Sequence, residues 1–245
     1  MNHNFESMIK DFESFNITLS DKQIEQFDKY YELLVDWNNK INLTAITEFD
    51  EVCKLHFVDS VSAANYFDFS KENLSLVDVG TGAGFPGIVL KIVFPNLHVT
   101  LLDSLQKRIY FLDTVIDELG LNETGSIKTV HGRAEDHSDI KKGKLREQFD
   151  IAVSRAVARF SILCEYDLPY VKEGGHFIAY KGDKGNEEIS EAKNAIFLLG
   201  GKVNSVNEFC LPGSDIQRTI CIIDKVQKTS SKYPRKAGTP QKNPL

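Results

Sequence analysis

The chain has 245 residues, of which 42% are hydrophobic and 26% charged, and 35 acidic against 29 basic side chains give it a formal net charge of -6. This composition excludes a disordered or low-complexity protein, and a chain of this length with four cysteines is not a disulfide scaffold. The acidic balance also argues against a protein that coats nucleic acid, because such proteins usually carry a basic excess.

The N-terminus and the cysteines indicate where the protein works. Residues 1–15 have neither the basic nor the apolar region of a signal peptide, and the chain contains no run of 18 apolar residues. No close pair of cysteines and no cluster of cysteine and histidine has the spacing of a zinc site. We therefore expect reduced thiols, no metal, no membrane segment and a cytoplasmic protein.

Residues 1–70 form the first predicted section, which is helical. From Ser20 to about Phe69 apolar residues recur at helical spacing, and Ser20 or Asp21 is a suitable N-cap. The section is acidic, with 12 Asp and Glu against 5 Lys in the first 60 residues. Its pattern does not indicate what these helices contact.

Residues 71–225 form the predicted core, in which short apolar runs alternate with amphipathic segments. Parallel strands need crossover helices, so this alternation predicts a doubly wound α/β sheet that is mostly parallel. The last two runs are joined by a short turn at 212–215, which predicts an antiparallel C-terminal hairpin at the sheet edge. The predicted strands are 74–79, 98–102, 126–130, 149–153, 176–180, 206–211 and 219–223.

Residues 226–245 form a basic tail that contains five Lys and Arg, no acid and three of the seven prolines. Without the tail, the first 225 residues have a formal net charge of -11, so the tail is a short basic segment attached to an acidic body. This composition predicts an extended, solvated arm that orders only against a partner, and a flexible end without function remains the alternative.

The strongest local signal is an apolar strand that runs into a glycine-rich turn and then a helix. Its glycines are Gly80, Gly82, Gly84 and Gly87. Glycines allow a sharp turn and a close approach of the backbone to a ligand, as in dinucleotide-binding sites. The spacing is shared by several ligands, and a tight turn without a ligand is the structural alternative.

Two residues beside this turn favour S-adenosylmethionine over NAD. Asp78 lies inside the end of the strand, just before the glycines, where a carboxylate suits the cationic aminoacyl part of the cofactor and repels a pyrophosphate. Pro86 removes an amide that a pyrophosphate would use. Asp103 closes the next strand, 21 residues after Gly82, and is expected to accept hydrogen bonds from ribose hydroxyls. A helix cap is the alternative role for Asp103.

The third and fourth strands end in polar loops at the same predicted edge of the sheet. After the third, a carboxylate from Glu135 or Asp136 and an amide of Ala134 or Glu135 match the edge of adenine, although a solvated charged turn is possible. After the fourth, Arg155 presents a planar cationic fork where the transferred methyl should point. Such a residue holds a base edge, a carboxylate or a phosphate, unless it forms only a surface ion pair.

Several segments in one order resemble a known family. They are WNNKINLTAIT, HFVDS, DVGTGAGFPG, LLDSLQKRIYFL, GRAED, SRAVARF, EGGHFIAYKG and YPRKAGTPQKNPL. Over nearly the whole chain they are similar to the bacterial 16S ribosomal RNA guanine-N7 methyltransferases, the glucose-inhibited division protein B family. The resemblance implies a class I methyltransferase fold, S-adenosylmethionine as cofactor and methylation of N7 of one guanine in small-subunit ribosomal RNA. It also implies cofactor positions at Gly80, Phe85, Ala134, Glu135 and Arg155.

Guanine N7 carries a lone pair and no proton, so its methylation needs alignment rather than a general base. We expect Arg155, or Ser154, to hold guanine O6 and to align N7 with the methyl group. Because the body is acidic, RNA contact must be local. The candidates are Arg133, Arg159, Lys181, Lys184, Lys232, Tyr233, Arg235 and Lys236.

Other functions remain open from the sequence alone. The chain could methylate another RNA, a small molecule or a protein with the same cofactor site, or it could be an NAD-dependent oxidoreductase. It could also be a non-catalytic ribosome assembly factor that retains the fold. The expected partner is 16S ribosomal RNA or the small ribosomal subunit, and the expected state is a monomer.

Overall fold

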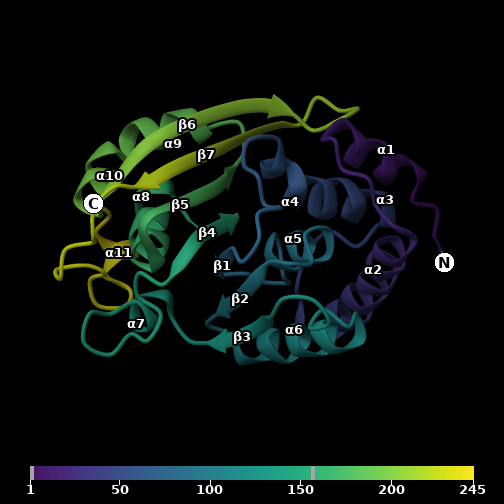
Figure 1. The fold of residues 1–245 in the computed structure, drawn as a ribbon, viewed down its shortest axis with the longest axis horizontal. Helices are drawn as coiled ribbons and strands as arrows, with labels where there is room; N and C mark the ends of the chain where they lie inside the picture. Colours follow the sequence, from purple (N-terminus) through teal and green to yellow (C-terminus); the bar gives the residue numbers. More distant parts are fainter. Residues whose placement is uncertain (1–2, 156–157) are drawn as a thin grey trace.

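A seven-stranded sheet forms the centre of the computed structural model, which describes residues 3–155 and 158–245 (Figure 1). Its strands are β1 (Ser75–Val79), β2 (His98–Asp103), β3 (Ile127–His131), β4 (Phe149–Arg155), β5 (Val171–Lys181), β6 (Gly201–Cys210) and β7 (Gln217–Lys225). They lie in the order β3-β2-β1-β4-β5-β7-β6. β1 to β5 pair in parallel, whereas β7 is antiparallel to both β5 and β6. The predicted doubly wound sheet with a C-terminal hairpin is confirmed.

Alternate residues of each strand face opposite layers, which explains why the core strands are apolar throughout. Leu76 and Ile178 belong to one core cluster, with residues of the N-terminal helices, α5 and α6. Their neighbours Val77 and Phe177 belong to a second cluster, with residues of α8, α9 and α10. The N-terminal helices therefore share a core with the sheet.

The helices that follow the sheet strands are α5 (Gly87–Val93), α6 (Gln106–Glu118), α7 (Ala134–His137), α8 (Phe160–Asp167), α9 (Gly185–Glu191) and α10 (Lys193–Leu198). Before them, α1 (Glu6–Ser14) and α2 (Asp21–Ile41) lead to a helical run over 49–65. This run consists of α3 (Phe49–Val52), a π-helical turn η1 (Cys53–Val58), α4 (Asp59–Val61) and a 3-10 turn η2 (Ser62–Asn65). A second 3-10 turn, η3 (Leu168–Tyr170), precedes β5. π-Helical turns are rare and frequently lie at functional sites.

Local signals and element ends agree in part. Ser20 caps α2 through a capping box with Gln23, as its position predicts. Helix α1 lies within the predicted helical section 1–70, ahead of the helical spacing that was recognised from Ser20 onward. β5 begins at Val171 and β6 at Gly201, each five residues before the predicted start. The added residues are mostly polar or glycine and only partly buried, so they break the apolar pattern.

The C-terminal segment, residues 226–245, is packed against the body, so the expectation of a solvated arm is wrong. Thr229 and Pro240 are buried, and a short helix α11 (Thr239–Lys242) contacts α8. Arg235 pairs with the fully buried carboxylate of Glu165. The sequence of the segment alone could not reveal these partners, because they come from other elements.

Two negative findings concern the described part of the chain. None of its helices is long and apolar enough to cross a membrane. Within residues 3–155 and 158–245 no group of His, Cys, Asp and Glu is arranged to hold a metal ion.

Candidate active site

The glycine-rich turn between β1 and α5 is fastened by Asp78, whose side chain is completely buried. Its Oδ2 accepts hydrogen bonds from Thr81 Oγ1 (2.7 Å) and from the Gly87 amide (2.8 Å). Burial raises the pKa of Asp78 to about 6 although these hydrogen bonds favour the carboxylate. Oδ1 has no hydrogen-bond partner among the described residues. Asp78 therefore shapes the turn through Oδ2, whereas Oδ1 is a buried acceptor without a hydrogen-bond donor in the described part of the chain.

The N-terminal helices support the same turn. Tyr30 of α2, fully buried, donates to the carbonyl of Ala83 at 2.5 Å. Gly84, at φ +95°, lies so close that an added Cβ would be 2.7 Å from the Tyr30 hydroxyl oxygen. The sequence did not indicate this contact, because the two residues are 53 positions apart. The contact shows that helix α2, in the acidic N-terminal section, supports the glycine-rich turn.

A first cavity, of about 140 Å³, opens at the carboxyl ends of β1, β2 and β3, and we call it the nucleoside cavity. It brings together the predicted residues Gly80, Asp103, Ala134 and Glu135. Its remaining lining residues are Val79, Leu102, Ser104, Gly132, Arg133, Tyr166 and Gln241. The sheet topology therefore gathers loops that are distant in sequence at one site.

Asp103 is held rigidly in this cavity. Its Oδ2 accepts from the Gly82 amide (3.0 Å) and from Arg108 Nη1 (3.1 Å), and its Oδ1 accepts from the Leu105 amide (2.9 Å). Leu105 is the N-cap residue of α6, so Asp103 also orders the turn that starts this helix. The two roles considered for Asp103, accepting hydrogen bonds from ribose hydroxyls and capping a helix, are thus compatible.

The nucleoside cavity fits the adenosine part of the predicted cofactor. The carboxylates of Asp103 and Glu135 are acceptors, which ribose hydroxyls and an adenine amino group require. Gly80 and Ala134 are small enough to admit a flat ring. The residues present therefore match a nucleoside.

A second cavity, of about 360 Å³, lies at the ends of β4 and β5, and we call it the Arg155 cavity. It is lined by Ile46, Leu55, His56, Asp59, Arg155, Tyr180, Lys181, Gly182, Glu188 and Arg218. The two cavities lie on either side of the β1 and β4 pair, where the strand order reverses. Ligands bind at such a point in doubly wound sheets.

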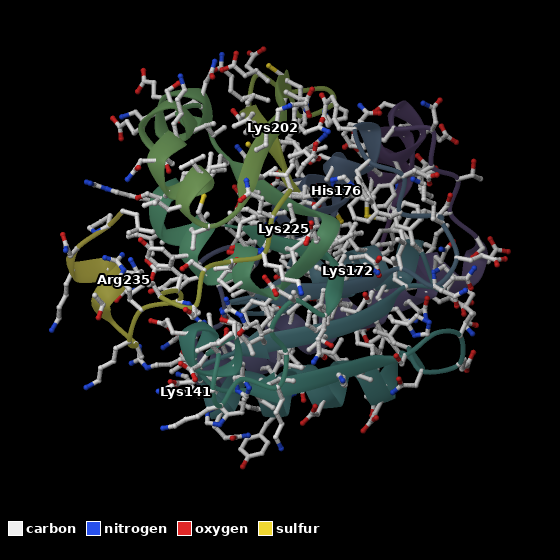
Figure 2. All side chains as sticks on the ribbon, turned by 60° about the vertical axis from the view of Figure 1, so that its left-hand side comes forward. Lys141, Lys172, His176, Lys202, Lys225 and Arg235 are labelled. Atoms are coloured by element: carbon white, nitrogen blue, oxygen red, sulfur yellow. The ribbon has the colours of Figure 1, made fainter. Side chains whose placement is uncertain are left out.

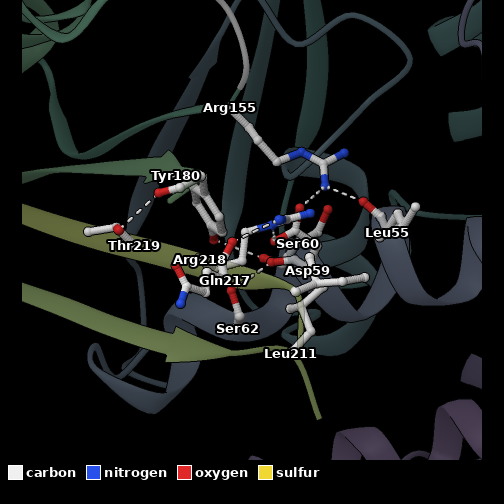
Figure 3. Close-up of polar contacts among 12 residues, drawn as sticks. Leu55, Asp59, Ser60, Ser62, Arg155, Tyr180, Leu211, Gln217, Arg218 and Thr219 are labelled. Atoms are coloured by element: carbon white, nitrogen blue, oxygen red, sulfur yellow. Dashed lines mark hydrogen bonds and ion pairs between the residues drawn. The ribbon is translucent and has the colours of Figure 1, made fainter. Parts of the chain in front are cut away.

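Asp59 organises the Arg155 cavity (Figure 3). Its Oδ2 is 3.0 Å from Arg155 Nη1 and its Oδ1 is 3.0 Å from Arg218 Nε. Arg155 Nη1 also donates to the carbonyl of Leu55 (3.0 Å), on the helical run. Figure 3 shows that the guanidinium of Arg155 reaches from the sheet to this run. The position of this guanidinium is therefore set by residues 96 and 100 positions earlier.

His56 and Phe85 pack beside Arg155. The His56 ring stacks on Phe85 at 4.5 Å, and the Arg155 guanidinium lies over the same phenyl ring at 5.2 Å. Burial and the adjacent Arg155 lower the pKa of His56 to about 4. Nδ1 lies 3.1 Å from the Leu55 carbonyl, which can only accept, and 3.3 Å from Arg155 Nη2, which can only donate, while Nε2 is 2.9 Å from Thr44 Oγ1. The lowered pKa indicates a neutral ring, and these contacts are compatible with either of its tautomers.

The eight predicted RNA contacts separate into two groups. Exposed side chains belong to Arg133, Arg159, Lys184, Lys232 and Lys236. Arg159 and Lys184 line one open hollow together with Glu187, Glu188, Glu191 and the last two residues of the chain. The remaining three are held by the protein itself. Lys181 donates to the carbonyl of Ala158 and pairs with Glu188, Arg235 pairs with Glu165, and Tyr233 packs on the second core cluster.

The sequence reasoning missed Asp59, His56 and Arg218 as site residues. Asp59 and His56 lie in the HFVDS segment, which was noticed only for its resemblance. That motif was the available signal. Residues Ala156 and Val157, within the SRAVARF segment, lie outside the described residues.

Comparisons with known proteins identify the family of the chain. Residues 23–221 match the family GidB, rRNA small subunit methyltransferase G. The ribosomal RNA small subunit methyltransferase G of Staphylococcus carnosus is 52% identical over 240 residues, which cover 98% of this chain and 98% of that protein. The protein of the same name from an Exiguobacterium species is 52% identical over 227 residues, 93% of each.

Solved structures show the same fold. A methyltransferase from Pyrococcus furiosus aligns with a TM-score of 0.53 and 15% identity, over 82% of this chain and 99% of that one. TYW2 of M. jannaschii in complex with AdoMet aligns with a TM-score of 0.51 and 15% identity, over 64% of this chain and 71% of that one.

Proposed function

The chain belongs to the rRNA small subunit methyltransferase G family, and from this premise we propose that it methylates N7 of one guanine in small-subunit ribosomal RNA. The methyl donor is S-adenosylmethionine, which supplies an electrophilic methyl group on a sulfonium centre. The observation that carries the proposal is the pair of cavities beside the β1 and β4 ends. One matches adenosine, and the other provides a separate space for a base next to Arg155.

The chemistry of N7 agrees with the residues of the Arg155 cavity. Its lone pair lies in the base plane and needs no deprotonation, so the site has to orient the base and exclude water. His56 is a neutral ring whose Nδ1 faces Arg155, and it stacks on Phe85. We assign it a positioning role, because it holds Arg155 and the aromatic wall in place.

Arg155 is the residue that we expect to contact the base. Its guanidinium is held by Asp59, Leu55 and Phe85, so its donors have a fixed direction. Guanine O6 lies beside N7 on the same edge and is a hydrogen-bond acceptor. A donor on O6 orients N7 and stabilises the charge that the ring acquires.

Replacement of this arginine tests the role. Arg155→Ala should lower single-turnover methylation of small-subunit RNA by roughly a hundredfold, as expected when a fixed donor that stabilises developing charge is removed. The affinity for S-adenosylmethionine, measured by calorimetry, should change by less than about threefold. Lys202→Ala, at an exposed lysine on the edge strand β6, is the control and should match wild type in both assays. A variant that mainly loses cofactor affinity would move Arg155 from the base to the cofactor.

The product identifies the substrate directly. Wild-type protein is incubated with labelled S-adenosylmethionine and naked 16S RNA, free small subunits or a small-molecule pool, and the labelled nucleotide is mapped. A single labelled guanine, methylated at N7, supports the proposal. Cofactor binding without transfer to any RNA would instead identify a non-catalytic assembly factor.

RNA binding is assigned to the exposed basic residues around the two cavities. Arg133 lines the nucleoside cavity, Arg159 and Lys184 share the adjoining hollow, and Lys232 and Lys236 lie on the C-terminal segment. The double variant Lys232→Met and Lys236→Met should reduce the slope of log affinity against log salt by about one to two. An unchanged slope would remove the two lysines from the interface.

We also infer a monomer that acts in the cytoplasm, where ribosomal RNA is found. The two most exposed large apolar side chains among the described residues, Phe197 and Tyr110, lie on separate elements, α10 and α6. Isolated residues of this kind do not form a dimer interface. Sedimentation equilibrium at micromolar concentration tests the monomer.

A further inference from the structure

The inner side of the C-terminal segment is anchored to the body by two arginines. Arg146, just before β4, donates to the carbonyls of Thr229 (2.6 Å) and Tyr233 (2.8 Å). Arg235, on the yellow segment in Figure 2, donates to fully buried Glu165 through its amide (2.7 Å) and its guanidinium (2.6–3.1 Å). Bidentate pairing of this kind fixes direction as well as distance.

Beyond Arg235 the segment reaches the nucleoside cavity. The Gly238 amide donates to Glu135 Oε1 at 2.9 Å, across 103 positions of sequence. Pro240 is buried, and Gln241 lines the cavity with Tyr166 of α8. A segment that looks like a tail in the sequence thus borders the residues predicted to hold adenine.

We propose that residues 226–245 are the outer wall of the nucleoside cavity and raise the affinity for the adenosine part of the cofactor. The Gly238 amide holds one oxygen of Glu135, so the carboxylate is oriented before the adenine amino group arrives. Gln241 brings a side-chain amide, which both donates and accepts, to the same cavity. Preorganisation raises affinity because less freedom is lost on binding.

The C-terminal segment has an exposed side and a side that packs against the body. Lys232 and Lys236 are exposed and make no contact with the cavity, whereas Arg235 between them is turned to Glu165. The inference rests on the cofactor of the proposed function but not on its RNA substrate. Cofactor binding measured without RNA therefore separates the two.

A matched pair of variants of the full chain tests the anchor. Arg235→Met removes the pair with Glu165, whereas Lys228→Met removes the same charge from an exposed position of the same segment. By calorimetry with S-adenosylmethionine, Arg235→Met should bind about tenfold more weakly. Lys228→Met should stay within about twofold of wild type. Far-ultraviolet circular dichroism and thermal unfolding without cofactor establish that both variants are folded.

A shortened chain keeps the proposal falsifiable if Arg235→Met does not fold. Ending the chain after Lys236 retains Arg235 and its partner Glu165 but removes the Gly238 amide and Gln241. We expect this protein to fold and to bind S-adenosylmethionine about tenfold more weakly than wild type. Unchanged or tighter binding by the shortened chain overturns the proposal. A wild-type protein that does not bind the cofactor would overturn the proposed function instead.

Discussion

Asp59 is the residue whose loss should disturb the Arg155 cavity most. It is 7% exposed at the side chain and lies 3.0 Å from each of two guanidinium groups, those of Arg155 and Arg218. At an effective dielectric constant of about 20, each pair at about 4 Å between charge centres has about 4 kcal/mol of gross Coulomb energy. Desolvation offsets much of this, but removal of one partner of a buried pair typically costs about 3–5 kcal/mol because the remaining charge is uncompensated.

Asp59→Asn keeps the shape and removes the charge. We expect its free energy of unfolding in urea to fall by about 3 kcal/mol or more, and its methylation rate to fall because Arg155 loses its direction. The control is Asp36→Asn, since Asp36 pairs with Lys40 at 2.7 Å but both side chains are about 60% exposed. That variant should lose no more than about 0.5 kcal/mol. Equal losses in the two variants would refute the reasoning, because they would show that burial of the Asp59 network does not matter.

Two further changes test the residues around this network. The pKa of His56 is lowered to about 4, so the unfolded chain binds more protons between that value and about 6.5, and this residue stabilises the fold fully only above about pH 6.5. Asp78, whose pKa is raised to about 6, changes the stability with pH in the opposite direction, so the effect of His56 is measured as the difference in free energy of unfolding between wild type and His56→Gln. This difference, measured in urea, should shrink by up to about 3 kcal/mol from pH 6.5 to 4. A difference that does not change with pH would contradict the lowered pKa of His56. Gly87→Ala would place a Cβ 2.5 Å from Leu101 Cδ2 and 2.7 Å from Asp78 Oδ2, so thermal unfolding should show that its free energy of unfolding falls by about 2 kcal/mol. Gly182→Ala is the control, because no atom of the described residues lies within 4 Å of its added Cβ, and its free energy of unfolding should fall by less than about 0.5 kcal/mol.

The fold could be predicted from the sequence because its signals are local. Each buried strand must be apolar along its length, and each crossover helix must repeat its apolar residues at helical spacing. These constraints act over fewer than about 20 residues, so the runs at 74–79 and 98–102 were visible without any partner. The glycine turn at Gly80 and the carboxylate of Asp103 were visible for the same reason, since both directly follow or end a strand.

Which charged groups meet was decided only by the tertiary structure. Asp59 meets Arg155 across 96 positions, and Glu135 meets the Gly238 amide across 103. The sequence does not distinguish a carboxylate that faces water from one that pairs with a guanidinium. Only packing determines its partner and therefore its contribution to stability. The basic C-terminal segment is the clearest case. Its charge is a property of the sequence, but its position against the nucleoside cavity depends on Glu165, a carboxylate that α8 buries 70 residues earlier.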